Sequence, residues 1–252
     1  ARKYGWSVHI IDAEAEGLSA PEVVETINAL NPRLIAIGVL GANPSAASTP
    51  KMAGTHVLLD KIHERRPDIC TVVYGLHPSA LPAKTLREEK VDFLCRGESF
   101  KTIVDLMAAL RASSSRDNYC IPGLWYKKDG TVVDNGWGSR VEPLDELPVA
   151  AWDLLPMHRY RAHNWHCLGF LDKRQPYAII YTSLGCPFAC TYCNIHALYG
   201  GKPGVRYRSI YSVLHEIDML VKVYGVKNVK VLDELFVLNK ERVMQFCKEL
   251  IQ

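Results

Sequence analysis

Three cysteines between positions 186 and 193 are the residues of this sequence best placed to do chemistry. They are Cys186, Cys190 and Cys193, spaced Cys-x₃-Cys-x₂-Cys, and a run of β-forming residues at 177–182 leads into them. Four thiolates usually hold a 4Fe–4S cluster, so three would leave one iron without a protein ligand. Because an open coordination position makes a metal site reactive, we expect a cluster whose open iron binds a substrate.

Zinc binding and disulfide formation are the alternatives for these cysteines. His196 follows Cys193 by three positions and could complete a zinc site. However, zinc pairs of the Cys-x₂-Cys type normally come with a second, distant pair, which this sequence lacks. A disulfide would leave an odd thiol. In a chain of this size with a strand–helix pattern, a local cysteine cluster more often indicates metal or redox chemistry in a reducing compartment, so we expect a cytoplasmic protein.

The composition is that of an ordinary globular protein. The chain has 252 residues, of which 48% are hydrophobic and 23% are charged, and its net charge is +3. This length suggests one large domain or two smaller ones. The sequence has neither a clustered basic patch for nucleic acid nor an apolar run of the ~18 residues that span a bilayer. It also lacks an initiator Met, and its last residues lie within a helical pattern, so we expect a fragment of a longer protein.

Strand and helix patterns alternate through the first 112 residues. The helix after Ser19 starts with a capping box, because Glu22 follows three positions later. The strand at 34–40 is apolar on both faces, as a central parallel strand should be. The strand-like runs are 7–11, 34–40, 69–74 and 92–95, and helical patterns follow them at 20–30, 57–62, 83–89 and 99–110. This alternation predicts a doubly wound, Rossmann-like parallel sheet.

Ligands of such sheets bind beyond the carboxyl ends of the strands. Three segments rich in Gly, Ser, Asn and Pro are expected there, at 41–49, 75–79 and 96–99. Small residues let the backbone approach a ligand closely, and Ser and Asn supply hydrogen bonds. These segments are therefore either binding loops or ordinary turns between a strand and a helix, and the residues alone leave both open.

The second half contains a linker and then a new strand–helix series. A polar stretch at 112–118 precedes a hairpin signal at Asp129-Gly130 and a proline-punctuated connector at 144–156, which we expect Trp152 to dock onto a domain. The new series begins at 177 and includes a strand that ends at Asp233-Glu234. We predict three parts: residues 1–112, the linker 113–176, and the start of a TIM-type barrel at 177–252. Catalytic residues of such barrels lie at the carboxyl ends of strands, where the cysteines and Asp233-Glu234 are expected.

The cysteine motif, with an aromatic residue just before its last cysteine, resembles the signature of the radical S-adenosylmethionine (SAM) enzymes. The resemblance implies that the open iron binds SAM and that an electron from the cluster cleaves it to a 5′-deoxyadenosyl radical. It also implies that Tyr192 lies near the adenine and that Asp233 and Glu234 help to hold the methionine ammonium. A flavodoxin or ferredoxin would supply the electron. Arg206 and Arg208 resemble a basic pair common after the loop, but we favour solvated surface charges for both.

The first half is similar to the cobalamin-binding subclass of these enzymes, which includes relatives of the anaerobic magnesium-protoporphyrin ester cyclase and many methyltransferases. Residues 74–82, 91–98 and 144–148 carry the similarity, which together with the cysteine motif covers nearly the whole chain. The resemblance implies that the amino-terminal sheet binds cobalamin. The residues that would contact it are Asn43, Ser45, Gly75, His77, Pro78, Ser79, Gly97 and Glu98.

This sequence departs from the family pattern in three ways, which limit the family properties that we can expect of it. There is no Asp-x-His-x-x-Gly motif, and His63 has the wrong spacing from Asp60, so we do not expect His63 to ligate cobalt. The usual Gly-Gly before the histidine is Tyr74-Gly75, which predicts a tighter backbone approach. Residues 177–252 hold two strand–helix units, whereas a full eight-unit barrel needs about 250 residues.

Our leading hypothesis is a radical SAM enzyme that uses cobalamin for methyl transfer to, or oxidative cyclisation of, an unactivated carbon. The substrate would be a small molecule or a peptide. The alternatives are a cobalamin-binding module without turnover and a zinc-stabilised structural protein.

Overall fold

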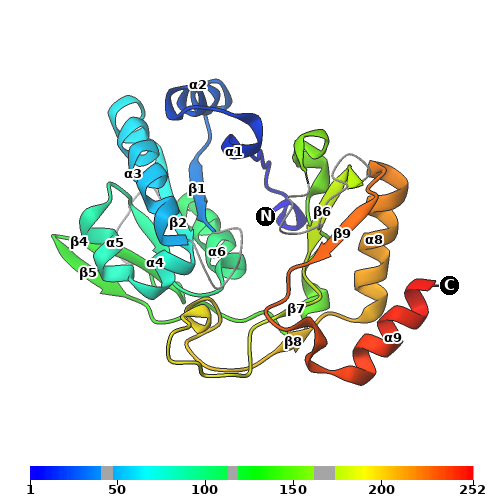
Figure 1. The fold of residues 1–252 in the computed structure, drawn as a ribbon. Coiled ribbons are helices and arrows are strands. Elements are labelled where there is room, and N and C mark those ends of the chain that lie inside the picture. Colours follow the sequence, from blue (N-terminus) through cyan, green and yellow to red (C-terminus); the bar gives the residue numbers. More distant parts are fainter. Residues whose placement is uncertain (41–47, 113–118, 162–173, 252) are drawn as a thin grey trace. The chain divides into compact units, whose positions relative to one another are not determined.

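The computed structural model describes residues 1–40, 48–112, 119–161 and 174–251 (Figure 1). The chain forms two compact units. The first unit comprises Ala1–Ser7, Leu18–Val141 and Pro187–Gly204, and the second comprises Val8–Gly17, Glu142–Cys186 and Val205–Gln252. Each unit therefore brings together segments that are distant in the sequence.

The first unit is built on a five-stranded sheet in the order β1-β2-β3-β4-β5. Strands β1 (Leu34–Val39), β2 (Cys70–Gly75) and β3 (Phe93–Cys95) are parallel, and β4 (Leu124–Lys128) and β5 (Thr131–Asp134) extend the sheet antiparallel to β3. The expected hairpin at Asp129-Gly130 is confirmed, since both residues have positive φ. It belongs to the main sheet, however, and not to a linker.

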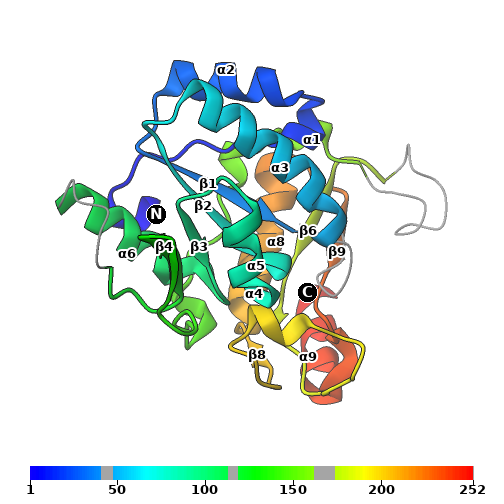
Figure 2. The ribbon, with the colours of Figure 1, turned by 90° about the vertical axis from the view of Figure 1, so that its left-hand side faces the viewer.

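Helices cover both faces of this sheet (Figures 1 and 2). Successive side chains of a strand point to opposite faces. On β2, Val72 packs in a cluster with Leu106 of α6 (Ser99–Ala112), whereas Val73 packs with Leu59 of α3 (Ser48–Arg65) and Leu86 of α5 (Pro82–Glu88). Both clusters are buried, which confirms the doubly wound sheet.

The local signals in this unit have mixed outcomes. Helix α2 (Ala20–Leu30) starts with the predicted capping box, in which the backbone N–H of Ser19 donates to Glu22 at 2.8 Å. Residues 7–11 form no strand, although their β-rich composition predicted one. The predicted loop at 75–79 is mostly a short helix, α4 (Leu76–Ala80), because a proline is tolerated within a first helical turn.

The second unit contains one strand–helix–strand motif. Strands β6 (Tyr177–Ile180) and β9 (Asn228–Val231) are parallel, and α8 (Ile210–Tyr224) connects them. Strand β7 (Ser183–Leu184) pairs antiparallel with β8 (Arg206–Tyr207), and α9 (Lys240–Ile251) follows β9. In the described part of the chain these strands close no barrel, as expected for two strand–helix units.

The core of the second unit includes the connector. Trp152 is 8% exposed and packs with Ile180 of β6 and Leu220 of α8, so the predicted docking of Trp152 is confirmed. The remaining short helices are Arg2–Tyr4, α1 (Ala13–Glu16), Leu144–Glu146, Trp152–Leu154, Met157–Arg159, Ile195–Leu198 and Phe236–Leu238. None of the helices that the structure describes is both long and apolar enough to cross a membrane.

Candidate cofactor-binding sites

The cysteine loop, residues 185–194, begins two residues after the buried Ser183. Its three cysteines are free thiols; Cys190 is exposed, and Cys186 and Cys193 are partly exposed. The boundary between the two units falls after Cys186, so each side of the loop is described separately. Within the described ranges, no three His, Cys, Asp or Glu side chains form a group that could hold a metal ion. The donor set itself, three accessible thiols, suits an iron–sulfur cluster.

His196 contacts the cysteine loop through one of its two ring nitrogens. Its Nε2 lies 2.7 Å from the carbonyl oxygen of Phe188, so this nitrogen carries the proton and donates. The other ring nitrogen, Nδ1, is buried and has no hydrogen-bond partner among the described residues. His196 therefore fixes the middle of the cysteine loop to the short helix Ile195–Leu198.

Asp233 ties the residues just before the loop to the end of β9. Its carboxylate accepts hydrogen bonds from the backbone N–H of Thr182 at 2.7 Å, from the Thr182 hydroxyl at 2.5 Å and from the Ser183 hydroxyl at 2.7 Å. Both donor residues are 1% exposed. The residue predicted to hold an ammonium thus uses both of its oxygens within the protein.

The other predicted SAM contacts lie in different environments. Tyr192 is 89% exposed, so its ring is open to a ligand. Glu234 is partly buried at the carboxyl end of β9. Burial, together with the carboxylates of Glu234 and Asp233, raises the pKa of Tyr181 to about 12.

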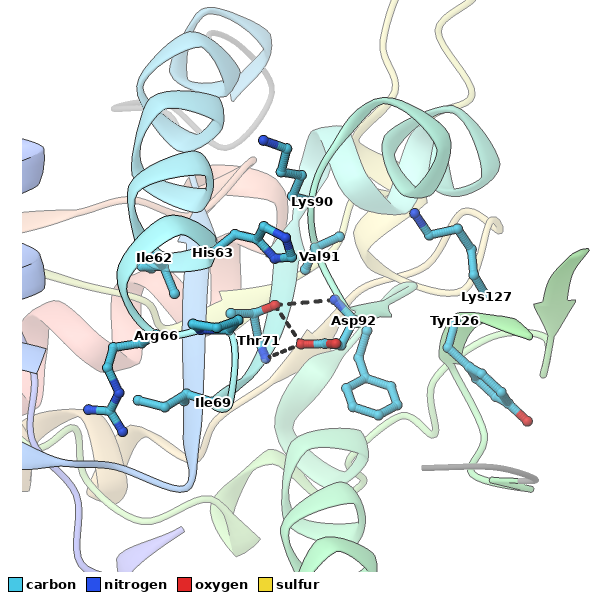
Figure 3. A pocket seen from close by; sticks show the side chains of 12 residues that line it. Ile62, His63, Arg66, Ile69, Thr71, Lys90, Val91, Asp92, Tyr126 and Lys127 are labelled. Carbon is cyan, nitrogen blue, oxygen red and sulfur yellow. Dashed lines mark hydrogen bonds between the residues drawn. The ribbon is translucent and has the colours of Figure 1, made fainter. Parts of the chain in front are cut away.

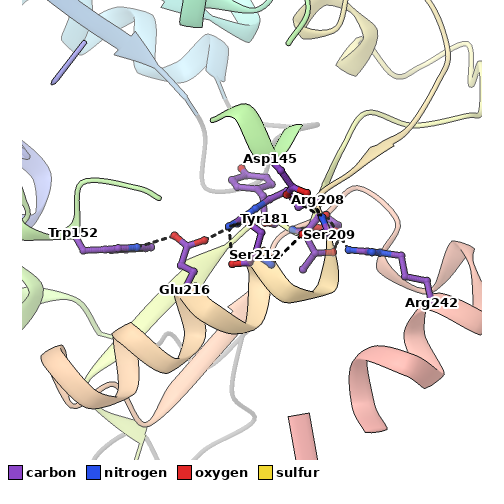
Figure 4. Close-up of polar contacts among 10 residues, drawn as sticks. Asp145, Trp152, Tyr181, Arg208, Ser209, Ser212, Glu216 and Arg242 are labelled. Atoms are coloured by element: carbon purple, nitrogen blue, oxygen red, sulfur yellow. Dashed lines mark hydrogen bonds and ion pairs between the residues drawn. The ribbon is translucent and has the colours of Figure 1, made fainter. Parts of the chain in front are cut away.

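Arg208 and Glu216 form a buried ion pair that the sequence analysis missed (Figure 4). The two side chains meet at 2.6 Å, and their exposed fractions are 16% and 4%. Arg208 also donates to the carbonyl oxygen of Tyr181 at 2.9 Å, and Trp152 donates to Glu216 at 2.8 Å. The available signal was a carboxylate between Val213 and Leu220 on the apolar face of α8.

The prediction that Arg206 and Arg208 are solvated surface charges is therefore wrong. Arg206 is 8% exposed, its Nε lies 3.8 Å from Glu142, and burial lowers the pKa of its guanidinium. Pairing of β8 with β7 brings both arginines into the unit, which their separation in the sequence did not indicate.

The carboxyl edge of the first sheet, where β1, β2 and β3 end at Val39, Gly75 and Cys95, is closely packed. Gly75 has φ +123°, and a Cβ there would lie 2.3 Å from the Val39 carbonyl oxygen. The two strand ends therefore approach each other as only glycine allows.

Most of the predicted cobalamin contacts belong to this edge. Ser79 is fully buried, and its hydroxyl accepts from the N–H of Gly97 at 3.0 Å, which ties the ends of β2 and β3 together. Glu98 is also buried and accepts from the N–H of Val141 at 3.1 Å. Pro78 is buried. Asn43 and Ser45 lie outside the described residues.

Among the predicted cobalamin contacts that the structure describes, His77 is the one that is partly exposed. Its Nδ1 lies 3.0 Å from the hydroxyl of Thr49 at the start of α3. Burial, and secondarily the charge of Lys84, lowers the pKa of His77. The imidazole is therefore neutral at pH 7, and it suits a neutral hydrogen-bonding partner.

The chain that follows the cysteine loop packs on this same edge. The short helix Ile195–Leu198, yellow in Figure 2, lies against α4, and both belong to the first unit. Trp137 covers two glycines: a Cβ would lie 3.2 Å from its ring at Gly97 and 2.8 Å at Gly201. The guanidinium of Arg96 lies over the Trp137 ring, 3.9 Å from its centre.

A cavity of ≈ 470 Å³ lies at the opposite, amino edge of the sheet (Figure 3). Its lining includes His63, Thr71, Lys90 and Asp92, and the carboxylate of Asp92 accepts from the N–H and hydroxyl of Thr71. His63 lines this cavity and is therefore at the amino edge, away from the carboxyl ends of the strands.

Comparison with known proteins shows what this chain is similar to. Residues 1–107 match the family model described as B12 binding domain. The chain is 30% identical over 246 residues to an uncharacterised methyltransferase of Pyrococcus horikoshii, a match that covers 97% of this chain and 49% of the relative. It is 27% identical over 248 residues to the anaerobic magnesium-protoporphyrin IX monomethyl ester cyclase of Rubrivivax gelatinosus, covering 97% and 41%.

Solved structures show the same fold. The radical S-adenosylmethionine methyltransferase TsrM from Kitasatospora setae superposes with a TM-score of 0.70 at 19% identity, covering 98% of this chain and 45% of that one. The cobalamin-dependent S-adenosylmethionine radical enzyme OxsB gives 0.67 at 20% identity, covering 96% and 32%. These findings confirm the resemblance and the fold class inferred from the sequence. The chain spans about half the length of these relatives, or less.

Proposed function

We propose that this chain is the cofactor-binding part of a cobalamin-dependent radical SAM enzyme. The enzyme would methylate, or oxidatively cyclise, an unactivated carbon of a small molecule or peptide. The observation that carries the proposal is the packing of Ile195–Leu198 against α4. It joins the chain that leaves the cysteine loop to the sheet edge at which a B12-binding domain is expected to hold its ligand.

The carboxyl edge would hold cobalamin through shape and backbone groups. Gly75 and Gly97 keep the strand ends free of side chains. The hydrogen bond from the Gly97 N–H to the Ser79 hydroxyl holds the ends of β2 and β3 together. His77 would offer a neutral imidazole edge. When bound, cobalamin supplies a cobalt centre suited to carrying a methyl group. The protein contributes orientation and the exclusion of water.

Cys186, Cys190 and Cys193 would hold the cluster. When bound together with SAM, the cluster supplies one-electron reduction chemistry. This chain would contribute the thiolates, the exposed ring of Tyr192 for the adenine, and His196 to order the loop. We further propose that a small electron carrier, such as a flavodoxin or ferredoxin, reduces the cluster.

Anaerobic reconstitution with iron and sulfide tests the cluster. The wild-type protein should bind both elements and gain visible absorbance, and a Cys186→Ala, Cys190→Ala, Cys193→Ala variant should not. The matched control is Cys120→Ala, Cys247→Ala, which removes two exposed thiols outside the loop and should bind as much iron as the wild type. Equal iron and sulfide in the triple variant would refute the assignment.

A cobalamin-binding module without turnover is the second candidate, because the family match lies entirely within residues 1–107. Adding cobalamin to the wild-type protein after reconstitution with iron and sulfide separates the two. Corrin binding without a cluster in the wild-type protein would favour the module. Zinc without sulfide in anaerobically purified wild-type protein would instead favour the structural alternative.

A further inference from the structure

Thr182, four residues before Cys186, is held by groups from three different elements. Its N–H and hydroxyl donate to Asp233, which follows β9. Its carbonyl oxygen accepts from the backbone N–H of Arg208 at 3.0 Å and from the guanidinium of Arg242, on α9, at 3.3 Å. Every polar group of this residue is therefore engaged within the second unit.

The neighbouring residues are fixed in the same way. The hydroxyl of Ser183 donates to Asp233 at 2.7 Å. The carbonyl of Tyr181 accepts from Arg208, whose guanidinium is held by the buried carboxylate of Glu216 (Figure 4). Two acidic residues thus hold a three-residue segment, Asp233 directly and Glu216 through Arg208.

The geometry points to Asp233 as a positioning residue for the cysteine loop, not a ligand of SAM. A carboxylate has about four acceptor positions, and Thr182 and Ser183 fill three of those on Asp233. If the Asp233 carboxylate also bound an ammonium group, that interaction would compete with the hydrogen bonds that fix the chain just after β6. This inference rests on the proposed function only in assuming that the loop holds a cluster. The hydrogen bonds between Asp233 and residues 182–183 do not depend on any cofactor.

Hydrogen exchange of the backbone amides, measured on protein free of metal and SAM, tests whether Asp233 holds Thr182. In Asp233→Ala the amide of Thr182 should exchange about tenfold faster or more, since a hydrogen bond to a charged acceptor contributes about 1.5–3 kcal/mol. The matched control is Glu234→Ala, the adjacent carboxylate, which should leave Thr182 exchange within about twofold of wild type.

Thr182→Val supplies a second variant, which keeps the β-branched shape and removes only the hydroxyl. A positioning role predicts that, after reconstitution, Thr182→Val weakens SAM binding in the same direction as Asp233→Ala, although it leaves the Asp233 carboxylate in place. The electron paramagnetic resonance signal of the reduced cluster with and without SAM reports that binding.

Two results would overturn the inference: unchanged Thr182 exchange in Asp233→Ala, or a Thr182→Val protein that binds SAM like wild type while Asp233→Ala does not. Failure of the proposed function would look different. No cluster would then form even in the wild-type protein, and the exchange result would still decide whether Asp233 holds the segment.

Discussion

The carboxyl edge of the first sheet and the cysteine loop are both predicted cofactor sites, but they are built differently. At the edge, Gly75, Ser79 and Gly97 are buried, and the N–H of Gly97 donates to the Ser79 hydroxyl. In the loop, Cys190 and Tyr192 are exposed, and flanking residues stabilise it: Ser183 donates to Asp233 before the loop, and His196 donates to the Phe188 carbonyl within it. A large rigid cofactor is served by a preformed surface, whereas thiolates can be ordered by the metal that they bind.

The largest expected effect comes from the ion pair that supports the approach to the loop. Glu216→Gln leaves the guanidinium of Arg208 buried without its counter-charge, which should cost about 3–5 kcal/mol in the free energy of unfolding. Urea denaturation measures it. Asp218→Asn, on the same helix but in an exposed pair with Lys222, should cost about 0–1 kcal/mol. Similar losses in both variants would show that the buried pair does not support this unit.

A methyl group at the carboxyl edge tests whether that surface is preformed. Gly75→Ala places a Cβ against the Val39 carbonyl oxygen at a positive φ, so we expect a loss of about 2–4 kcal/mol and weakened cobalamin binding. Thermal denaturation and corrin absorbance are the measurements. Gly54→Ala, in α3 with open space around it, should instead be neutral or slightly stabilising. If the edge could instead rearrange around the methyl group, the melting temperature and cobalamin binding would both remain unchanged, which would contradict a preformed surface.

A smaller effect is expected from the hydrogen bond between His196 and the Phe188 carbonyl in the cysteine loop. His196→Ala removes the hydrogen bond to the Phe188 carbonyl, worth about 0.5–1.5 kcal/mol, so the loop should open several-fold more often. Chymotrypsin, which cuts after aromatic residues, should then cleave faster at Phe188 and Tyr192. His215→Ala, an exposed histidine on α8, is the control. Equal cleavage rates in the two variants would mean that His196 does not order the loop.

The smallest expected effect is a pH dependence at the carboxyl edge. The pKa of His77 is lowered in the folded protein, mainly by burial, so the unfolded chain binds more protons at mildly acidic pH. The stabilising contribution of neutral His77 is complete above the unfolded pKa of about 6.5 and is lost as the pH falls through the lower, folded value. Melting temperatures of wild type and His77→Gln should therefore converge as the pH falls below 6.5. Parallel curves would contradict this.

Local sequence signals predicted the elements that depend on nearby residues. The capping box at Ser19, the turn at Asp129-Gly130 and the strand at 34–39 are present. The predicted central, buried position of that strand is wrong, because β1 lies at the edge of the described sheet and Val39 is its only buried residue. Residues 7–11 had strand composition but form none, because a strand also requires a neighbour to pair with its backbone. The helix at 76–80 was missed, because its proline and the glycine before it are also typical of a turn.

By itself, the sequence determined the donor chemistry, since three thiols at fixed spacing belong to one continuous segment, and it determined the alternation that builds a doubly wound sheet. Only the tertiary structure decided the roles of Asp233, Glu216, Arg208 and His196. Each of these side chains acts through a partner brought near by folding, and its burial or pairing depends on that partner. A charge such as Arg208 looks solvated in the sequence and becomes structural once β8 pairs with β7.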